Sequence, residues 1–427
     1  MSATPRAARA RARPVAVIVA LVLGVSELLS ACSAQPPAAG APPATVHSPA
    51  TPAPPPSQTA RASAAARSPA PAAPYAFTGV GGLATEAARA RPLVYVPNQL
   101  AGTVQIIDPR TYAVIATRGV PRSPEHVVPS PDLRRLWVNS DAGDALTPIN
   151  PKTGTLGAPL QVRDPYNLYF TPDGHSALVM AERLRRVDVR DAHTMALKRS
   201  LPVPCDGINH ADFTADLTKL LISCEFSGQL ALLDASATRV IHMIDLNRIA
   251  TPGATPPTRA RSMGGPAAML ATGANSMPQD IRLSPDGRSF LVADMLRNGV
   301  WVIDATTFRE TRFISTGRGA HGIYPARDAR RIFVSNRDEG SISVLDSVSL
   351  RRLTTWRIPG GGSPDMGGVT ANGRELWFSG RYDACVYVID TVTGHLTHRI
   401  KVGPGPHGLL VWPQPGRFSL GHTGNMR

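Results

Sequence analysis

Four of the eleven histidines occupy the same kind of position in this sequence, directly after a turn and at the start of a predicted strand. These histidines are His126, His210, His321 and His407. Asp280 and Asp365 occur at equivalent positions, and Arg381 lies in a turn predicted to reach the same region. Imidazoles and carboxylates that converge can ligate Zn, Cu or Fe, or can act as general acids and bases. These seven residues are therefore the candidate ligand site.

The same residues also fit simpler roles. A histidine that begins an inner strand can hydrogen-bond the backbone at the channel mouth without binding a ligand. His126 and His210 differ in register from His321 and His407, so the four need not converge. Arg381 suits an anionic ligand, but a salt bridge to Asp365 or Asp383 is the favoured interpretation. The sequence requires no cofactor, and a transition metal or a noncovalent haem is the cofactor that this set would hold.

A repeat of about 42 residues must position these side chains. Each repeat contains a short β-branched strand, a polar turn and a second strand that closes on Asp or a substitute. The closing positions are Asp108, Asn150, Arg190, Asp234, Asp304, Asp346 and Asp390. Their spacings are 42, 40, 44, 70, 42 and 44 residues, and the value of 70 indicates one repeat plus an insertion at about 247–276.

Each repeat reads as four short strands, called a to d from the axis outward. Pro-Asp-Gly turns separate strands a and b, and Asp304 begins a turn in which its carboxylate can bond amides two residues on. Four strands in about 40 residues indicate a β-propeller blade. We expect an all-β, seven-bladed propeller over residues 76–427, closed by a C-terminal strand a at 407–412 beside N-terminal strands b to d. The segment 417–422 resembles a further strand without an assigned place.

The repeats carry a family resemblance. Tyr95-Val96-Pro97-Asn98, Val334-Ser335-Asn336 and the Pro-Asp-Gly turns resemble the YVTN-repeat, or YncE-like, propellers over residues 90–425. The resemblance implies the fold strongly and a function weakly, because one fold carries many functions. The haem-d1 propeller of nitrite reductase and the sugar-lactone hydrolases are analogies at superfamily level only.

The N-terminus is typical of an exported lipoprotein. Arginines in residues 1–13 precede an apolar stretch from Val15 to Val25, and Leu29-Ser30-Ala31-Cys32 matches a bacterial lipobox. Residues 1–31 are thus predicted to be a signal peptide, and Cys32 the lipidation site. Residues 32–75, rich in Pro and Ala, are predicted to be an extended tether. An ordinary signal with a chance Cys is the alternative, which the late charge of Glu27 keeps open.

An exported chain favours oxidised cysteines. Cys205 precedes a strand a and Cys224 ends strand b of the same blade, so folding the hairpin brings them opposite each other. We expect a Cys205–Cys224 disulfide, with two thiols or a Cys/His metal site with His210 as alternatives. Cys385, within a strand c, is expected to be a buried free thiol.

The charge and the absence of several known motifs exclude some classes of function. The formal charge of +14 comes without a Lys/Arg run or a nucleic-acid motif, so no specific nucleic-acid partner is expected. No Cys-x-x-Cys-His, Gly-x-Ser-x-Gly or His-Glu-x-x-His is present. The preferred hypothesis is a monomeric, membrane-tethered scaffold, a binding protein in preference to an enzyme. It would bind an envelope protein or small molecule through its loop face. The alternative is a periplasmic redox or accessory protein with a metal or haem at the channel mouth.

Overall fold

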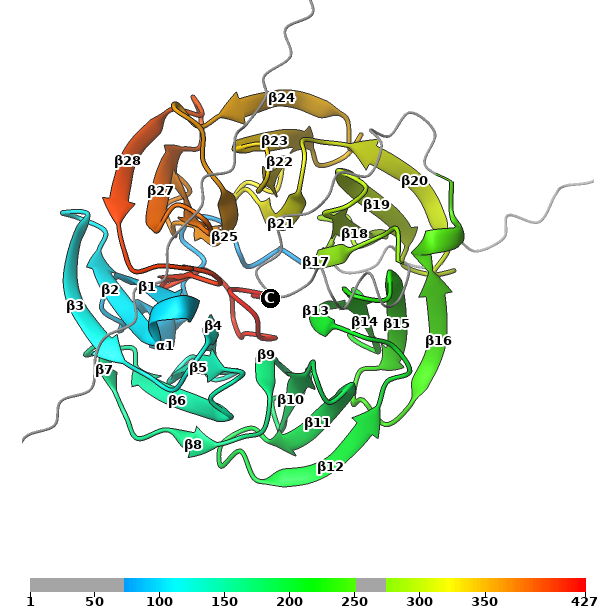
Figure 1. Cartoon of the computed structure of the whole chain (residues 1–427), viewed down its shortest axis with the longest axis horizontal. Coiled ribbons are helices and arrows are strands. Elements are labelled where there is room, and N and C mark those ends of the chain that lie inside the picture. The colour runs from blue at the N-terminus through cyan, green and yellow to red at the C-terminus, as the bar shows by residue number, and fades with distance from the viewer. Residues whose placement is uncertain (1–72, 251–273) are drawn as a thin grey trace, which may run out of the picture. The chain divides into compact units, whose positions relative to one another are not determined.

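The architecture is known from a computed structural model that describes residues 73–250 and 274–427. In these residues seven antiparallel sheets are arranged around a central axis as the blades of a propeller (Figure 1). The predicted all-β, seven-bladed fold is therefore confirmed. The predicted signal peptide, Cys32, nearly all of the tether and most of the 247–276 insertion lie outside the described residues.

Each blade consists of consecutive strands, except at the closure of the ring. In chain order the blades are β29 (Leu410–Trp412) with β1 (Leu93–Asn98), β2 (Thr103–Asp108) and β3 (Ala113–Gly119); β4 (Pro124–Pro129), β5 (Leu136–Ser140), β6 (Ala145–Asn150), β7 (Thr155–Leu156) and β8 (Leu160–Gln161); β9 (Pro165–Phe170), β10 (Ser176–Ala181), β11 (Arg186–Asp191) and β12 (Leu197–Pro202); and β13 (Ile208–Phe213), β14 (Lys219–Cys224), β15 (Gln229–Asp234) and β16 (Val240–Asp245). The other three are β17 (Pro278–Leu283), β18 (Ser289–Asp294), β19 (Gly299–Asp304) and β20 (Glu310–Ser315); β21 (Ala320–Pro325), β22 (Arg331–Asn336), β23 (Ser341–Asp346) and β24 (Arg352–Arg357); and β25 (Pro364–Val369), β26 (Glu375–Gly380), β27 (Cys385–Asp390) and β28 (Leu396–Lys401).

Helical structure is limited to three short elements among the described residues. These are α1 (Thr85–Ala88) and the 3₁₀ turns η1 (Gln99–Ala101) and η2 (Leu246–Arg248). No helix in this part of the chain is long and apolar enough to cross a membrane.

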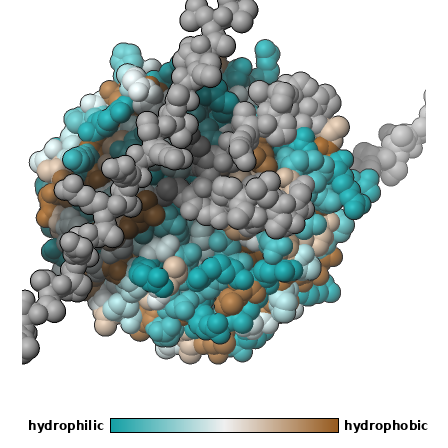
Figure 2. All heavy atoms as spheres, viewed as in Figure 1, coloured by the Kyte–Doolittle hydropathy of each residue, from teal (hydrophilic) through white to brown (hydrophobic). Residues whose placement is uncertain are grey.

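Burial follows the position of each strand in its blade. The three inner strands are almost continuously buried, as in β17 and β18, because neighbouring blades cover both faces. The outermost strand is polar and largely exposed, as β12 shows with its sequence Leu-Lys-Arg-Ser-Leu-Pro. In the space-filling view, hydrophilic side chains accordingly cover much of the lower rim, where β12 lies, and hydrophobic residues are scattered (Figure 2).

The turns form as their sequences predict. Asp304 Oδ1 accepts hydrogen bonds from the backbone N–H groups of Thr306 and Thr307, at 3.0 and 2.7 Å. In the Ser-Pro-Asp-Gly turn, Ser284 donates to Asp286, and Gly287 adopts a positive φ of 72° that favours glycine. These turns fix the length of each strand and thereby the position at which the next strand a begins.

The ring closes between the two ends of the repeat region, as predicted. Strand β29 pairs antiparallel with β1, with Trp412 opposite Leu93 and Leu410 opposite Tyr95. The regular strand is shorter than the predicted 407–412, because His407 and Gly408 lie in an irregular segment and Gly408 forms a bridge to His126 of the next blade.

The C-terminal tail enters the middle of the ring, where Figure 1 shows the C-terminus. Gly421 forms a bridge with Tyr169, and the backbone N–H of His422 donates to the carbonyl of Leu168. The Arg427 guanidinium binds the carboxylate of Asp212 at 2.6 Å, and both side chains are buried. The predicted strand at 417–422 has no place in a blade. Residues 417–427 instead form a plug, and its residues contact the inner strands.

The predicted disulfide is present. Cys205 and Cys224 are bonded, with their Cα atoms 5.9 Å apart, and Cys385 is a buried free thiol. Because Cys205 is bonded to Cys224, neither sulfur is a ligand beside His210.

Candidate functional site

The inner strands begin close to the axis, and their first residues face one another across the central channel. Five histidine side chains meet there, and each is at least 99% buried. They are His126 of β4, His210 of β13, His321 of β21, His407 before β29, and His422 of the tail. All four histidines selected from the sequence therefore lie in the channel, and the fifth comes from the plug.

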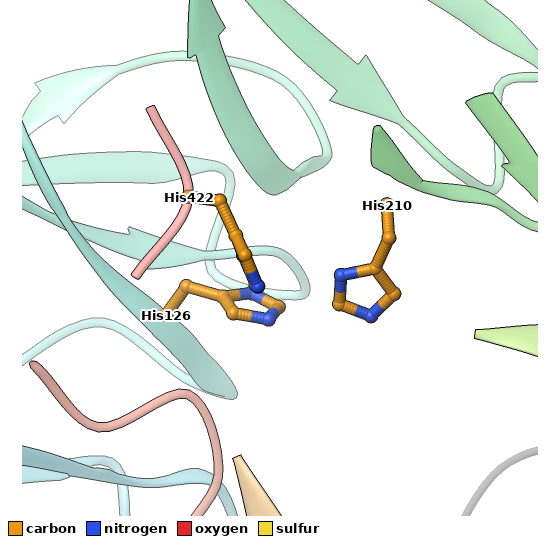
Figure 3. A group of neighbouring side chains, drawn as sticks. All are labelled: His126, His210 and His422. Atoms are coloured by element: carbon orange, nitrogen blue, oxygen red, sulfur yellow. The ribbon is translucent and has the colours of Figure 1, made fainter. Parts of the chain in front are cut away.

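Three of the five form a compact group. One ring nitrogen from each of His126, His210 and His422 lies within 4.8 Å of the corresponding nitrogen of the other two. Figure 3 shows the three side chains approaching one another from β4, β13 and the tail. Their ring centroids are 5.5 Å apart for His126 and His210, 5.2 Å for His126 and His422, and 5.0 Å for His210 and His422. Metal–nitrogen bonds of about 2.0–2.1 Å would require the three nitrogens to move closer together.

The tautomer of His126 is set by the backbone. Its Nδ1 lies 3.0 Å from the carbonyl oxygen of Tyr166, which can only accept, so Nδ1 carries the proton. The opposite nitrogen, Nε2, therefore presents a lone pair, and it has no hydrogen-bond partner. Burial lowers the pKa of His126 to about 4, so the ring is neutral at pH 7. A neutral imidazole with an unpartnered lone pair is the form that ligates metals.

His210 and His422 share one polar neighbour. The amide nitrogen of Asn167 lies 3.3 Å from Nδ1 of His210 and 3.1 Å from Nδ1 of His422. Their Nε2 atoms are buried without a hydrogen bond, and that of His422 is 3.5 Å from Asp280 Oδ1. Burial also holds the pKa values of both imidazoles well below the ordinary value. The two rings are thus neutral. Because the amide nitrogen of Asn167 can only donate, it favours the tautomer with the lone pair on Nδ1 and the proton on Nε2, and an ion on either Nε2 would require that proton to move to Nδ1.

The other two histidines, His321 and His407, lie beside the carboxylate of Asp365. Asp365 lies 2.6 Å from Nδ1 of His407 and 3.1 Å from Nδ1 of His321, and it accepts a hydrogen bond of 2.8 Å from Arg337 Nε. Burial acts to raise the pKa of Asp365, but Arg337 and His321 outweigh it, and the pKa lies below its usual range. The ionised carboxylate orients His407 with Nδ1–H toward itself, whereas Nδ1 of His321 lies close to the carboxylate without a hydrogen bond. The four predicted histidines therefore divide into two neighbouring sets, as their difference in register suggested.

Asp280 faces the three-histidine group. Its Oδ2 accepts from the backbone N–H of Ile323 at 2.9 Å and lies 3.4 Å from Arg282 Nε. Its Oδ1 has no hydrogen bond and points to His422. Burial raises the pKa of Asp280 to about 6. Asp280 is therefore a neighbour of the donor set that can balance the charge of a bound cation.

The predicted salt bridge from Arg381 to Asp365 or Asp383 is wrong. Its guanidinium donates to Gln99 at 2.9 Å and lies 3.7 Å from Glu125, whereas Arg337 occupies Asp365. Asp383 instead accepts from Ser363 and Tyr387. The physical reason is the placement of η1, which brings Gln99 across the ring closure to Arg381.

Three residues of the site were not selected from the sequence. His422 lies in a tail that follows no repeat, and its only signal was a histidine at the end of the repeat region. Tyr166 and Asn167 stand at the start of β9, in the same aligned position as the histidines. Their position in the repeat predicted that they lie at the channel. Tyrosine and asparagine are, however, not residue types that indicate a metal or catalytic site by themselves.

Comparison with known proteins decides the family. The profile of the YncE-like β-propellers matches residues 59–200 and 260–416, which is most of the chain. The chain belongs to the YncE-like β-propeller family. No curated protein matches this YncE-like chain.

Solved structures share the fold of the YncE-like chain at low identity. Hydrazine synthase of Kuenenia stuttgartiensis is 16% identical with a TM-score of 0.57, over 71% of this chain and 94% of that chain. A functionally unknown protein from Desulfotomaculum acetoxidans is 13% identical with a TM-score of 0.57, over 75% and 98% of the two chains. The dihydro-haem d1 dehydrogenase NirN is 16% identical with a TM-score of 0.51, over 75% of each chain. Likeness at this level concerns the fold alone.

Proposed function

We propose that this YncE-like propeller binds a transition metal ion in its central channel through His126, His210 and His422. The observation that carries the proposal is the convergence of three buried, neutral imidazoles whose nitrogens lie within 4.8 Å of one another. Each has an Nε2 without a hydrogen bond. Leaving a buried polar atom unsatisfied costs about 1–3 kcal/mol, so these unsatisfied imidazole nitrogens favour a bound ligand.

The three imidazole donors limit which metal ions the site would bind. Three imidazole nitrogens suit Zn, Cu, Ni and Fe, whereas Mg and Ca prefer oxygen. The depressed pKa values also mean that protons do not compete with the ion at pH 7. Because His126 comes from one blade, His210 from another and His422 from the plug, a bound ion would join two blades to the plug.

Metal analysis tests this proposal. The full-length protein, exported by its host and purified without chelator, is expected to contain at least one Zn or Cu ion per chain. His126→Gln, His210→Gln and His422→Gln should each lower the affinity for added Zn²⁺ at the three-histidine site by at least 100-fold. His193→Gln, at an exposed histidine outside the channel, is the matched control and should bind like the wild type. If the three channel variants kept both the metal content and the Zn²⁺ affinity of the wild type, the proposal would be contradicted.

We infer further that the protein is exported and anchored by a lipid on Cys32. Support comes from the arginine-rich start, the apolar stretch and the lipobox residues, followed by a Pro/Ala-rich segment. The wild type should incorporate labelled palmitate and sediment with membranes. Cys32→Ala should abolish labelling and change the distribution, and a variant that labels like the wild type would refute lipidation at this residue.

A binding scaffold is the second candidate function. It is supported by the insertion that separates β16 from β17, because the loops leaving outer strands lie on one face of a propeller. An envelope protein or a small molecule would bind there. Deletion of residues 251–273 should abolish recovery of such a partner by crosslinking in intact cells, and unchanged recovery would exclude a role for the insertion.

A further inference from the structure

A second pair of donor atoms lies beside the three-histidine site. Nε2 of His407 and Oε2 of Glu125 are 3.9 Å apart, and both side chains are 99% buried. The hydroxyl of Tyr166 is 3.4 Å from the same Nε2. A cation bound by one nitrogen and one oxygen at about 2.0–2.2 Å each would fit between His407 and Glu125.

Asp365 prepares His407 for this role. The ionised Asp365 accepts the Nδ1 proton of His407 at 2.6 Å, so the lone pair is left on Nε2. Metal-binding histidines commonly have such a carboxylate behind the ring, which fixes the tautomer and increases the basicity of the ligand. The orientation of His407 is therefore set before any ion arrives.

Glu125 has one satisfied oxygen and one unsatisfied oxygen. Its Oε1 accepts hydrogen bonds from Gln99 at 2.6 Å and Ser123 at 3.0 Å, while Oε2 has none. The nearest cation is Arg381, 3.7 Å from Oε2, and its guanidinium is already bound to Gln99. An anchored carboxylate whose second buried oxygen has no hydrogen bond and faces an imidazole lone pair suits a bound cation.

The two donor sets adjoin. The ring centroids of His126 and His407 are 4.8 Å apart, the shortest separation between any two channel imidazoles. We propose that the channel binds two metal ions, the second held by His407 Nε2, Glu125 Oε2 and the Tyr166 hydroxyl next to the first. The first of these two ions is the one in the proposed function, and this inference rests on that proposal for it. The second position is argued from its own residues. Paired ions in proteins lie about 3.5–4 Å apart, which suits neighbouring sets of this kind.

Native mass spectrometry of the full-length protein with added Zn²⁺ counts the ions directly. The wild type should bind two, while Glu125→Gln and His407→Gln should each bind one and retain the first. Glu182→Gln is the matched control, because Glu182 is another buried carboxylate near this mouth without a close contact to a channel histidine, and it should bind two. His210→Gln should lose the first ion and retain the second.

Electron paramagnetic resonance with Cu²⁺ gives a measurement that needs no variant. The first equivalent should give an isolated Cu²⁺ signal, and the second should couple to it and reduce the signal per ion. One tightly bound ion in the wild type, with Glu125→Gln unchanged, would overturn the second position and leave the first intact. No bound ion in any protein would refute both proposals, so the two failures are distinguishable.

Discussion

The amide nitrogen of Asn167 lies 3.1 Å from Nδ1 of His422, and this contact ties an inner strand to the C-terminal plug. The same nitrogen lies 3.3 Å from Nδ1 of His210. Asn167 therefore stands behind two of the three imidazoles that we propose as ligands.

Substitution of Asn167 tests whether these imidazoles act through Nε2. An ion on both Nε2 atoms requires protons on both Nδ1 atoms, which need an acceptor behind them. Asn167→Asp supplies a carboxylate acceptor and should increase the affinity for Zn²⁺ by about 10–100-fold, whereas Asn167→Leu only removes a donor that opposes this tautomer and should not decrease the affinity. Isothermal titration with Zn²⁺ at pH 7 measures both. Equal affinities for the two variants would show that Asn167 does not orient the ligands.

Asp365 should be essential for stability as well as for the site. It is fully buried and contacts Arg337, His321 and His407, so Asp365→Asn leaves a buried guanidinium without its counter-charge. We expect the free energy of unfolding in urea to fall by about 3–5 kcal/mol. The double variant Asp365→Leu with Arg337→Met should recover part of the loss, because it removes both charges. A fall below about 1 kcal/mol in the single variant would argue against a tightly coupled pair.

Acid should destabilise the metal-free protein through His126. The folded pKa of His126 is about 4 and the ordinary value is 6.5, so between these pH values the unfolded chain binds more protons. The contribution of His126 is fully present above pH 6.5 and is lost as the pH falls to 4. At 1.36 kcal/mol per pH unit this amounts to about 3 kcal/mol.

The measurement compares the wild type with His126→Gln in chelator, by urea unfolding between pH 7.5 and 4. The stability of the wild type relative to the variant should decrease across this range. Burial raises the pKa of Glu125 to about 7, and its contribution is lost as the pH rises through that value, which is the opposite slope. Glu125 is present in both proteins, so its effect largely cancels. Parallel pH profiles would contradict a buried neutral His126.

The disulfide should stabilise one blade measurably. Cys205 and Cys224 are separated by 19 residues, and closing a loop of this size contributes about 3 kcal/mol. Cys205→Ala with Cys224→Ala should lower the free energy of unfolding by about this amount. Reductant should have the same effect on the wild type and none on the double variant, in which Cys385, a free thiol in the wild type, is the remaining cysteine among the described residues. A wild type insensitive to reductant under unfolding conditions would contradict the bond.

Much of the fold was predictable because the repeat fixes it locally. The closing Asp residues mark each turn, and Asp304 makes the backbone bonds that its position predicts. The pairing of β29 with β1 followed from counting strands, since one strand a was missing at the start and present at the end. The Cys205–Cys224 pair followed from the hairpin between them.

The site was only partly predictable, because it depends on which way side chains turn at the start of each inner strand. The register shifts there, between Pro124 and His126, between Ile208 and Ala211, and between Ala320 and Ile323. Such irregularities re-aim side chains, so adjacent positions face different partners. His422 could not be placed because the tail has no repeat to specify its path, and the partner of Arg381 comes from a segment about 280 residues away.

The plug sets the order in which the site can be assembled. His422 is 296 positions after His126, so the three-histidine group cannot exist until the chain has been made through residue 422 and the ring has closed. Contacts over such separations form late in folding, because a long loop must close before they contribute. An ion would therefore be acquired after synthesis and ring closure, from the compartment in which the finished propeller resides, and not by the nascent chain.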